Sequence, residues 1–103
     1  MLIYGFGSYF NSRKSYGDID ILIVHDAVSK ESCLKAIHIK KIILKEIVGS
    51  SVTILSKSAE EDFDFIKVSG AIGLGVVDEK MDKPCINEIV QKTILFRQTY
   101  RFR

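Results

Sequence analysis

Cysteine and histidine are scarce in this chain of 103 residues, which contains two of each. Cys33 and Cys85 stand 52 positions apart without a C-x-x-C pair, so the sequence predicts neither a zinc site nor a disulfide framework. Reduced cysteines are typical of the cytoplasm, and we therefore expect a cytoplasmic protein.

A long apolar run is also lacking. No stretch approaches the roughly 18 residues that a membrane-spanning helix requires. The first ten residues are uncharged, but they lack the basic start and the small-residue cleavage site of a signal peptide. We expect a soluble protein that does not contact a membrane.

Neither charge dominates the chain, which has 15 Lys and Arg residues against 13 Asp and Glu residues. This balance argues against a protein that binds nucleic acid or anionic membranes over its whole surface. The last fifteen residues contain no acid, and their bases are Lys92, Arg97, Arg101 and Arg103. We favour a solvated helix end whose bases complement the helix dipole. Docking on an acidic surface is the alternative, and direct nucleic-acid binding, hinted at by Tyr100 and Phe102, is not favoured.

Hydrophobic residues make up 47% of the chain and charged residues 27%, which is the balance of a globular protein. One domain, 1–103, is expected, because domains usually hold about 100 to 150 residues. Little chain remains beyond its core, so an active site would need a second wall from a protein partner or from another copy of the chain.

Apolar runs bounded by turn residues alternate with stretches of helical period. The predicted strands are Leu2–Phe6, Ile19–Val24 and Ser51–Leu55. The predicted helices are 29–49, 58–69 and about 84–100, the last of them basic. Gly70–Val77, with three glycines, is predicted to be a loop or an irregular edge strand. The order predicts an α/β (α+β) fold, a small mixed sheet with helices on one side.

The helix at 29–49 is predicted to pack through one apolar arc, with Ser29 as its N-cap and Gly49 just after its C-cap. The arc contains Cys33, Ala36, Ile37, Ile43, Leu44, Ile47 and Val48. Lys40 falls within the arc and could reach a ligand, but we favour a lysine that extends along the apolar surface to solvent. The next helix is predicted to begin with a capping box from Ser58 to Glu61.

A Gly-Ser turn and an Asp-x-Asp pair are the chemically informative part of the sequence. Gly7 and Ser8 follow the first strand, and after nine further residues Asp18 and Asp20 open the second. Because strand side chains alternate between faces, the two carboxylates share one face, with Cα atoms about 6.5 to 7 Å apart. One or two hard, oxygen-ligated cations would relieve their repulsion, and Mg²⁺, or Mn²⁺ in its place, suits such a site.

The Gly-Ser turn is suited to phosphate. Gly7 lets a phosphate approach the backbone closely, and the Ser8 hydroxyl and neighbouring amides can donate hydrogen bonds to it. Arg13 and Lys14 are placed to neutralise further phosphate charge. Each part alone is common in structural turns, but their combination between two apolar strands predicts a site for a nucleoside triphosphate and its metal.

Residues 3–8 and 17–24 resemble the signature of the nucleotidyltransferases of the DNA polymerase β superfamily. That signature is an apolar strand, G-[GS], a short connection, and D-x-[DE] within a second apolar strand. The resemblance covers roughly residues 2–56 and is greatest to the minimal nucleotidyltransferase domains of prokaryotes. It implies the nucleotidyltransferase fold, with Gly7 and Ser8 on phosphate and Asp18 and Asp20 as catalytic metal ligands.

The implied activity is Mg²⁺-dependent transfer of a nucleoside monophosphate, AMP from ATP in the first instance, to a hydroxyl of a partner protein or an RNA end. Minimal domains of this family are often paired with small helical proteins of the HEPN type in toxin–antitoxin or antiviral defence modules. The resemblance therefore also implies an antitoxin or defence role.

The sequence departs from the family at two places. The family commonly has a third carboxylate on the next core strand, where this chain has Thr53, and a hydroxyl cannot replace a carboxylate as a base or charged ligand. Glu60 or Glu61 could approach the site, although a helix start explains both better. Many relatives also have a helix before the first strand, which this chain enters at Leu2. The alternative function is a catalytically impaired module that binds a helical partner.

Overall fold

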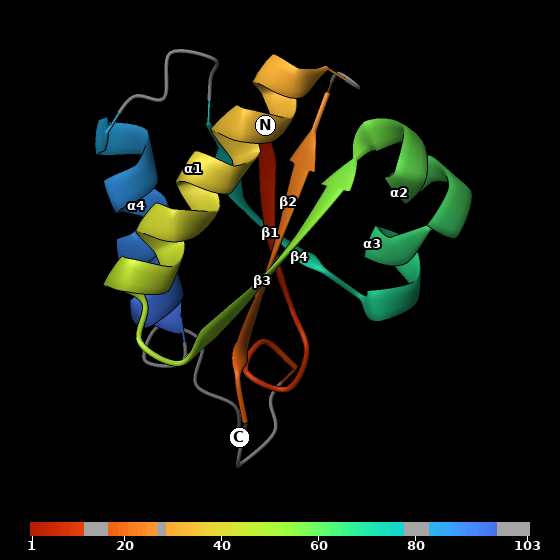
Figure 1. The fold of residues 1–103 in the computed structure, drawn as a ribbon. Coiled ribbons are helices and arrows are strands. Elements are labelled where there is room, and N and C mark those ends of the chain that lie inside the picture. Colours follow the sequence, from red (N-terminus) through yellow and green to blue (C-terminus); the bar gives the residue numbers. More distant parts are fainter. Residues whose placement is uncertain (12–16, 27–28, 78–82, 97–103) are drawn as a thin grey trace.

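The computed structural model describes residues 1–11, 17–26, 29–77 and 83–96 (Figure 1). Its strands are β1 (Leu2–Phe6), β2 (Ile19–His25), β3 (Ser50–Ser56) and β4 (Ile72–Val76). Its helices are α1 (Lys30–Glu46), α2 (Lys57–Phe63), α3 (Phe65–Ser69) and α4 (Lys83–Ile94). The three strands predicted from apolar runs are confirmed, each within one residue of its expected bounds at either end.

The strands form one mixed sheet in the order β3-β2-β1-β4. β1 is antiparallel to both β2 and β4, whereas β2 and β3 are parallel and are joined through α1. The residues of β2 from Ile21 to Val24 are almost fully buried, as expected of a continuous apolar run at the centre of a sheet. The predicted mixed α/β architecture is therefore confirmed.

The prediction of helices on one side holds for the two long helices, α1 and α4. The core lies between them and the sheet, and it includes Ile21 and Ile23 of β2, Ile39 and Ile43 of α1, and Ile89 and Val90 of α4. Figure 1 shows the short helices α2 and α3 on the other side of the sheet. There the rings of Phe65 and Phe6 meet edge to face, with centroids 5.0 Å apart.

The predicted packing face of α1 is only half right. Ser29 is the N-cap, since its hydroxyl accepts a hydrogen bond from the Ser32 amide, and Ala36, Ile39 and Ile43 are buried. Of the predicted arc, Cys33, Ile37, Leu44 and Val48 are exposed instead. The predicted apolar arc is wider than the part of α1 that the sheet covers. Only the residues along one side of the arc, together with Ile39, therefore reach the core.

The segment predicted as one helix from Ser58 to Ser69 is two short helices. Ser56, rather than Ser58, is the N-cap of α2, because its hydroxyl accepts a hydrogen bond from the Ala59 amide. Asp64, with φ of 51°, is in the left-handed region and ends α2. Aspartate tolerates that region better than most residues do, so the chain turns there before α3 begins.

The glycine-rich segment forms β4, an edge strand whose pairing with β1 shifts register between Ile3 and Tyr4. Of the two alternatives predicted for this segment, a loop and an irregular edge strand, the structure has the edge strand. The last helix, α4, begins at Lys83, one residue before its predicted start, and includes Pro84 in its first turn. The basic residues Arg97, Arg101 and Arg103 lie outside the described residues.

Candidate functional site

The Gly-Ser turn lies at the end of β1 and is a compact, hydrogen-bonded loop. Gly7 has φ of 78°, in the left-handed region that glycine adopts without strain. The Phe10 amide donates to the Gly7 carbonyl at 3.2 Å, and the Asn11 amide donates to the Ser8 carbonyl at 3.4 Å. These bonds hold the backbone around Ser8 in one conformation.

Two aromatic residues that follow the Gly-Ser pair fasten this turn to the core. Tyr9 and Phe10 are both buried, and their rings meet edge to face with centroids 5.0 Å apart. The Tyr9 hydroxyl donates to the Thr93 carbonyl at 2.7 Å, near the end of α4. Phe10 lies against Gly5, where a Cβ would collide with its ring. Neither residue was predicted from the sequence, although an aromatic pair directly after a turn is a signal for such an anchor.

Gly7 and Asp20 are in direct contact across the β1–β2 pair. Asp20 pairs with Phe6 in the antiparallel register, which brings the start of β2 beside the turn. A Cβ added to Gly7 would overlap the Oδ2 atom of Asp20. The carboxylate therefore lies over the bare glycine backbone, so the turn and the acid pair are parts of one site.

Asp18 and Asp20 are on the same side of β2, as their alternation predicts. The residue between them, Ile19, is buried in the core, while Asp18 is exposed and Asp20 is half-buried. Burial, and after it the charge of Asp18, raises the pKa of the Asp20 carboxyl above its ordinary value. The two carboxyl groups are thus close enough to repel each other, and a bound cation would relieve that repulsion.

Two hydroxyl residues of β3 lie on the same face as Asp20. In the parallel register, Ser51 pairs with Asp20 and Thr53 with Leu22, and both hydroxyl residues are exposed. Thr53, where the resemblance predicts a third carboxylate, is therefore two residues along β3 from Ser51, the partner of Asp20. Ser51, directly beside Asp20, was not singled out from the sequence because a serine in a strand has no distinctive pattern.

A third carboxylate does not join the pair within the described part of the chain. No group of three or more His, Cys, Asp or Glu residues suited to a metal ion occurs among residues 1–11, 17–26, 29–77 and 83–96. Glu60 and Glu61 lie on α2, and α2 follows the far end of β3. Any cation at Asp18 and Asp20 would thus need further oxygen ligands from phosphate, water or a partner.

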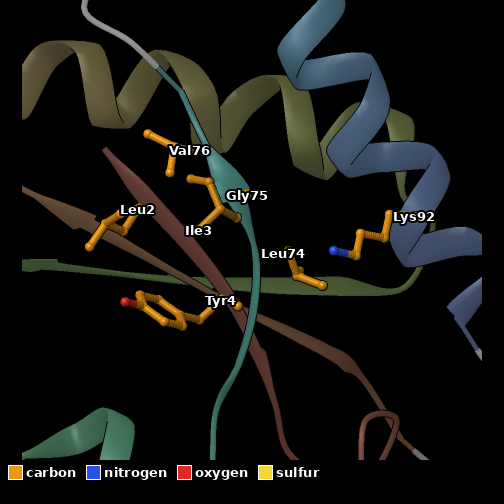
Figure 2. Close-up of a pocket in the computed structure, with 8 residues that line it drawn as sticks. Leu2, Ile3, Tyr4, Leu74, Gly75, Val76 and Lys92 are labelled. Atoms are coloured by element: carbon orange, nitrogen blue, oxygen red, sulfur yellow. The ribbon is translucent and has the colours of Figure 1, made fainter.

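The predicted phosphate ligands are only partly described. Gly7 and Ser8 lie beside Asp20 as stated, but Arg13 and Lys14 are outside the described residues. A hollow of about 290 Å³ lies elsewhere, along β1 and β4, with Leu2, Tyr4, Val76 and Lys92 among its lining residues (Figure 2). Since Leu2 pairs with Val24, at the other end of β2 from Asp20, this hollow is not part of the candidate site.

Comparison with known proteins does not identify the chain. No family model matches it, and no curated protein or solved structure matches it significantly. In the described ranges, no helix combines the length and the apolar character needed to cross a bilayer.

Proposed function

We propose that the protein is a Mg²⁺-dependent nucleotidyltransferase that transfers a nucleoside monophosphate, AMP in the first instance, from a nucleoside triphosphate to a hydroxyl group. The observation that carries this proposal is the contact between the bare backbone of Gly7 and the Asp20 carboxylate, with Asp18 on the same side of the strand. A turn suited to phosphate and a pair of acids suited to a cation thus adjoin each other.

The reaction in this proposal is a displacement at the α-phosphorus. The acceptor oxygen forms a bond to that phosphorus, the bond from phosphorus to the bridging oxygen breaks, and pyrophosphate leaves with the bonding pair. The acceptor proton passes to solvent or to a base on the partner. Asp18 and Asp20 would hold the Mg²⁺, which neutralises phosphate charge when bound. The turn at Gly7 and Ser8 would orient the triphosphate by hydrogen bonds to its oxygens.

The raised pKa of Asp20 supports a cation site. Burial, and after it the charge of Asp18, disfavours the charged form of Asp20, and a bound Mg²⁺ would offset that cost. The acceptor in this proposal belongs to a protein partner or to an RNA end. The resemblance adds a biological setting, that of an antitoxin or defence component.

Incubation of the protein with labelled ATP, Mg²⁺ and candidate acceptors tests the proposal. We expect acceptor labelling and pyrophosphate release, and loss of both in the Asp18→Asn/Asp20→Asn variant. The matched control is Asp62→Asn, which removes an exposed carboxylate from α2 and should leave labelling unchanged. Absence of labelling with all four nucleoside triphosphates and several acceptors would overturn the proposal.

A second candidate function is favoured by Thr53. Its hydroxyl occupies the face and strand where a third acid is expected, and it can neither act as a general base nor supply a negative ligand. A module of this kind would act by binding a partner, not by chemistry. The Asp18→Asn/Asp20→Asn variant separates the two functions, because cellular activity would survive in a binding module and be lost in an enzyme.

A further inference from the structure

The outer side of β4 is a sheet edge that no described strand covers. β4 stands at one end of the order β3-β2-β1-β4, so only its inner side is paired. Val77 exchanges two hydrogen bonds with Met1, at 2.7 and 2.8 Å. The preceding residue, Val76, therefore directs its N–H and C=O away from β1, because residues of a ladder alternate in this way. Among the described residues, no hydrogen-bond partner of those two groups is found.

β4 itself carries none of the residues that discourage a further strand from pairing. Charged side chains and proline within an edge strand have that effect. Residues 70–77 contain neither, and three of the eight are glycine. A Cβ added at Gly73 would lie in open space, so another backbone can approach the strand there. The edge can therefore accept one more strand.

The hollow of about 290 Å³ along β1 and β4 lies at this edge (Figure 2). Leu2 and Val76 line it and are 37% and 60% exposed. Figure 2 shows Lys92 reaching from α4 toward Leu74, while Leu2 and Tyr4 lie on the other side of β4. A strand added here would thus meet an ammonium group on one face and apolar side chains on the other.

Lys92 gives the hollow its charge. It is exposed, it is the one charged residue among the described residues that line the hollow, and no ion pair joins it to a described acid. A lysine beside a sheet edge repels a basic segment and attracts an acidic one. Lys92 therefore selects among the strands that could pair with β4.

We propose that β4 pairs with an extended segment of a protein partner in which acidic and apolar residues alternate. Successive side chains of a strand point to opposite faces, so the acidic ones would lie on the α4 side, near Lys92. The apolar ones would cover Leu2 and Val76. The backbone of the segment would extend the sheet by hydrogen bonds to the outer edge of β4.

A second copy of the chain is disfavoured as the occupant. When two β4 strands pair antiparallel over their full length, residues 70–77 of both copies oppose each other, and these contain no acid. The two-fold axis of such a pair is perpendicular to the sheet, so both α4 helices lie on the same face. Lys92 lies beside Leu74, at the middle of β4, so the two ammonium groups would be neighbours without a counter-charge.

The proposed pairing is separate from nucleotidyl transfer. The hollow lies at the opposite end of β2 from Asp20, and no step of the proposed reaction involves β4. The pairing would therefore stand if the protein proved to have no enzymatic activity, and its failure would leave the proposed activity untouched.

Two designed peptides test the charge argument. Each has about nine residues, the length of a long strand, and valine alternates with glutamate in one and with lysine in the other. We expect the full chain to bind the glutamate peptide about fivefold more tightly, the effect of an exposed ion pair gained and a repulsion avoided. The preference should shrink at high salt, because salt screens exposed charges. Equal binding of both peptides, or binding of neither, would overturn the proposal.

N-methylated forms of the glutamate peptide test the backbone pairing. Successive amides of a strand point to opposite sides, so only every second amide faces β4. Methylation of all amides should abolish binding. Methylation of the valine amides alone, or of the glutamate amides alone, should leave binding intact in at least one case. Binding of the fully methylated peptide, or loss in both half-methylated ones, would show that the peptide is not held as a strand and would overturn the proposal.

Variants of the full chain locate the edge. Val76→Pro removes an outward N–H and should lose the glutamate peptide. Lys92→Glu should reverse the preference in favour of the lysine peptide, whereas Lys41→Glu, the same change at an exposed lysine of α1, should leave it as it is. Circular dichroism checks that each variant is folded. Lys92→Glu changes an exposed side chain and so tests the edge even if Val76→Pro does not fold. An unchanged preference in Lys92→Glu would overturn the proposal.

Sedimentation of the chain alone distinguishes the remaining occupant. We expect a monomer in the absence of peptide. A dimer that Val76→Pro converts to a monomer would assign the edge to the β4 strand of a second copy and would overturn the proposed partner.

Discussion

Gly7 and Asp20 are so close that any side chain at position 7 would occupy the space of the Asp20 carboxylate. This contact joins the end of β1 to the beginning of β2, and it is where the turn meets the acid pair. Position 7 therefore favours glycine for two reasons: a side chain would collide with Asp20, and the backbone has φ of 78°. Both requirements can be measured separately.

Gly7→Ala should destabilise the protein by about 1 to 3 kcal/mol, because the alanine would be strained at positive φ and would displace Asp20. Gly49→Ala is the matched control, because Gly49 has φ of 81° and open space where a Cβ would lie. Its loss of folding free energy should come from backbone strain alone. Urea unfolding measures both. Equal losses in the two variants would show that contact with Asp20 has no energetic effect.

Tyr9→Phe should cost about 1 kcal/mol of folding free energy, since it removes a buried hydrogen bond to the Thr93 carbonyl while keeping the ring. Tyr4→Phe is the control, because no hydrogen bond of the Tyr4 hydroxyl to another described residue is found. Thermal unfolding of both variants, compared with the wild type, gives the difference. If the proposed function is right, Tyr9→Phe should also weaken triphosphate binding through a looser turn.

Asp20→Asn should stabilise the protein at neutral pH in the absence of divalent ions. The pKa of Asp20 is raised in the folded state, so the folded protein holds that proton more tightly than the unfolded chain does. Its contribution to stability is therefore present at low pH and is lost as the pH rises through the folded-state pKa. Melting curves across a pH series should show this fall in the wild type and not in Asp20→Asn. A variant less stable than the wild type at neutral pH would contradict the expectation.

Mn²⁺ or Mg²⁺ should raise the melting temperature of the wild type and leave Asp18→Asn/Asp20→Asn unchanged, if the pair binds a cation. Saturation at a hundred times the dissociation constant corresponds to about 2.7 kcal/mol of stabilisation. The effect should weaken in acid, because protons compete for Asp20. An equal shift in the double variant would place the ion elsewhere.

Ile39→Ala should cost about 2 to 5 kcal/mol, whereas Ile37→Ala should cost far less. Ile39 is buried on the side of α1 that faces the core, and Ile37 is 37% exposed on the outer side of the same helix. The two residues have the same side chain on the same helix, so the comparison isolates burial. Similar losses would mean that the packing face of α1 is the one predicted from the sequence.

The sequence predicted where the strands and helices lie better than it predicted which of their residues are buried. Short runs rich in β-branched residues identified β2 and β3, because few other arrangements suit such residues. The helical period of α1 identified the helix but not which part of its apolar arc is covered, since periodicity reports side-chain chemistry and not the width of the opposing sheet. The break at Asp64 was missed because left-handed backbone at aspartate depends on tertiary context.

The candidate site could be predicted to a similar extent. Alternation predicted Asp18 and Asp20 on one side, and the charge of Asp18 does act on Asp20. The antiparallel pairing of β1 with β2 brings the turn beside Asp20. The anchoring of the turn by Tyr9 could not be predicted, because its partner Thr93 lies 84 residues away and a backbone carbonyl carries no sequence signature.

That separation has a consequence for the order of assembly on the ribosome. β1 and β2 are neighbours in the sequence and can pair early in synthesis, which brings Gly7 to Asp20. Tyr9 must wait for α4, the last helix described, before its hydroxyl finds the Thr93 carbonyl. The loop beside the acids is therefore fastened only after α4 has been synthesised, later than the residues that pair β1 with β2.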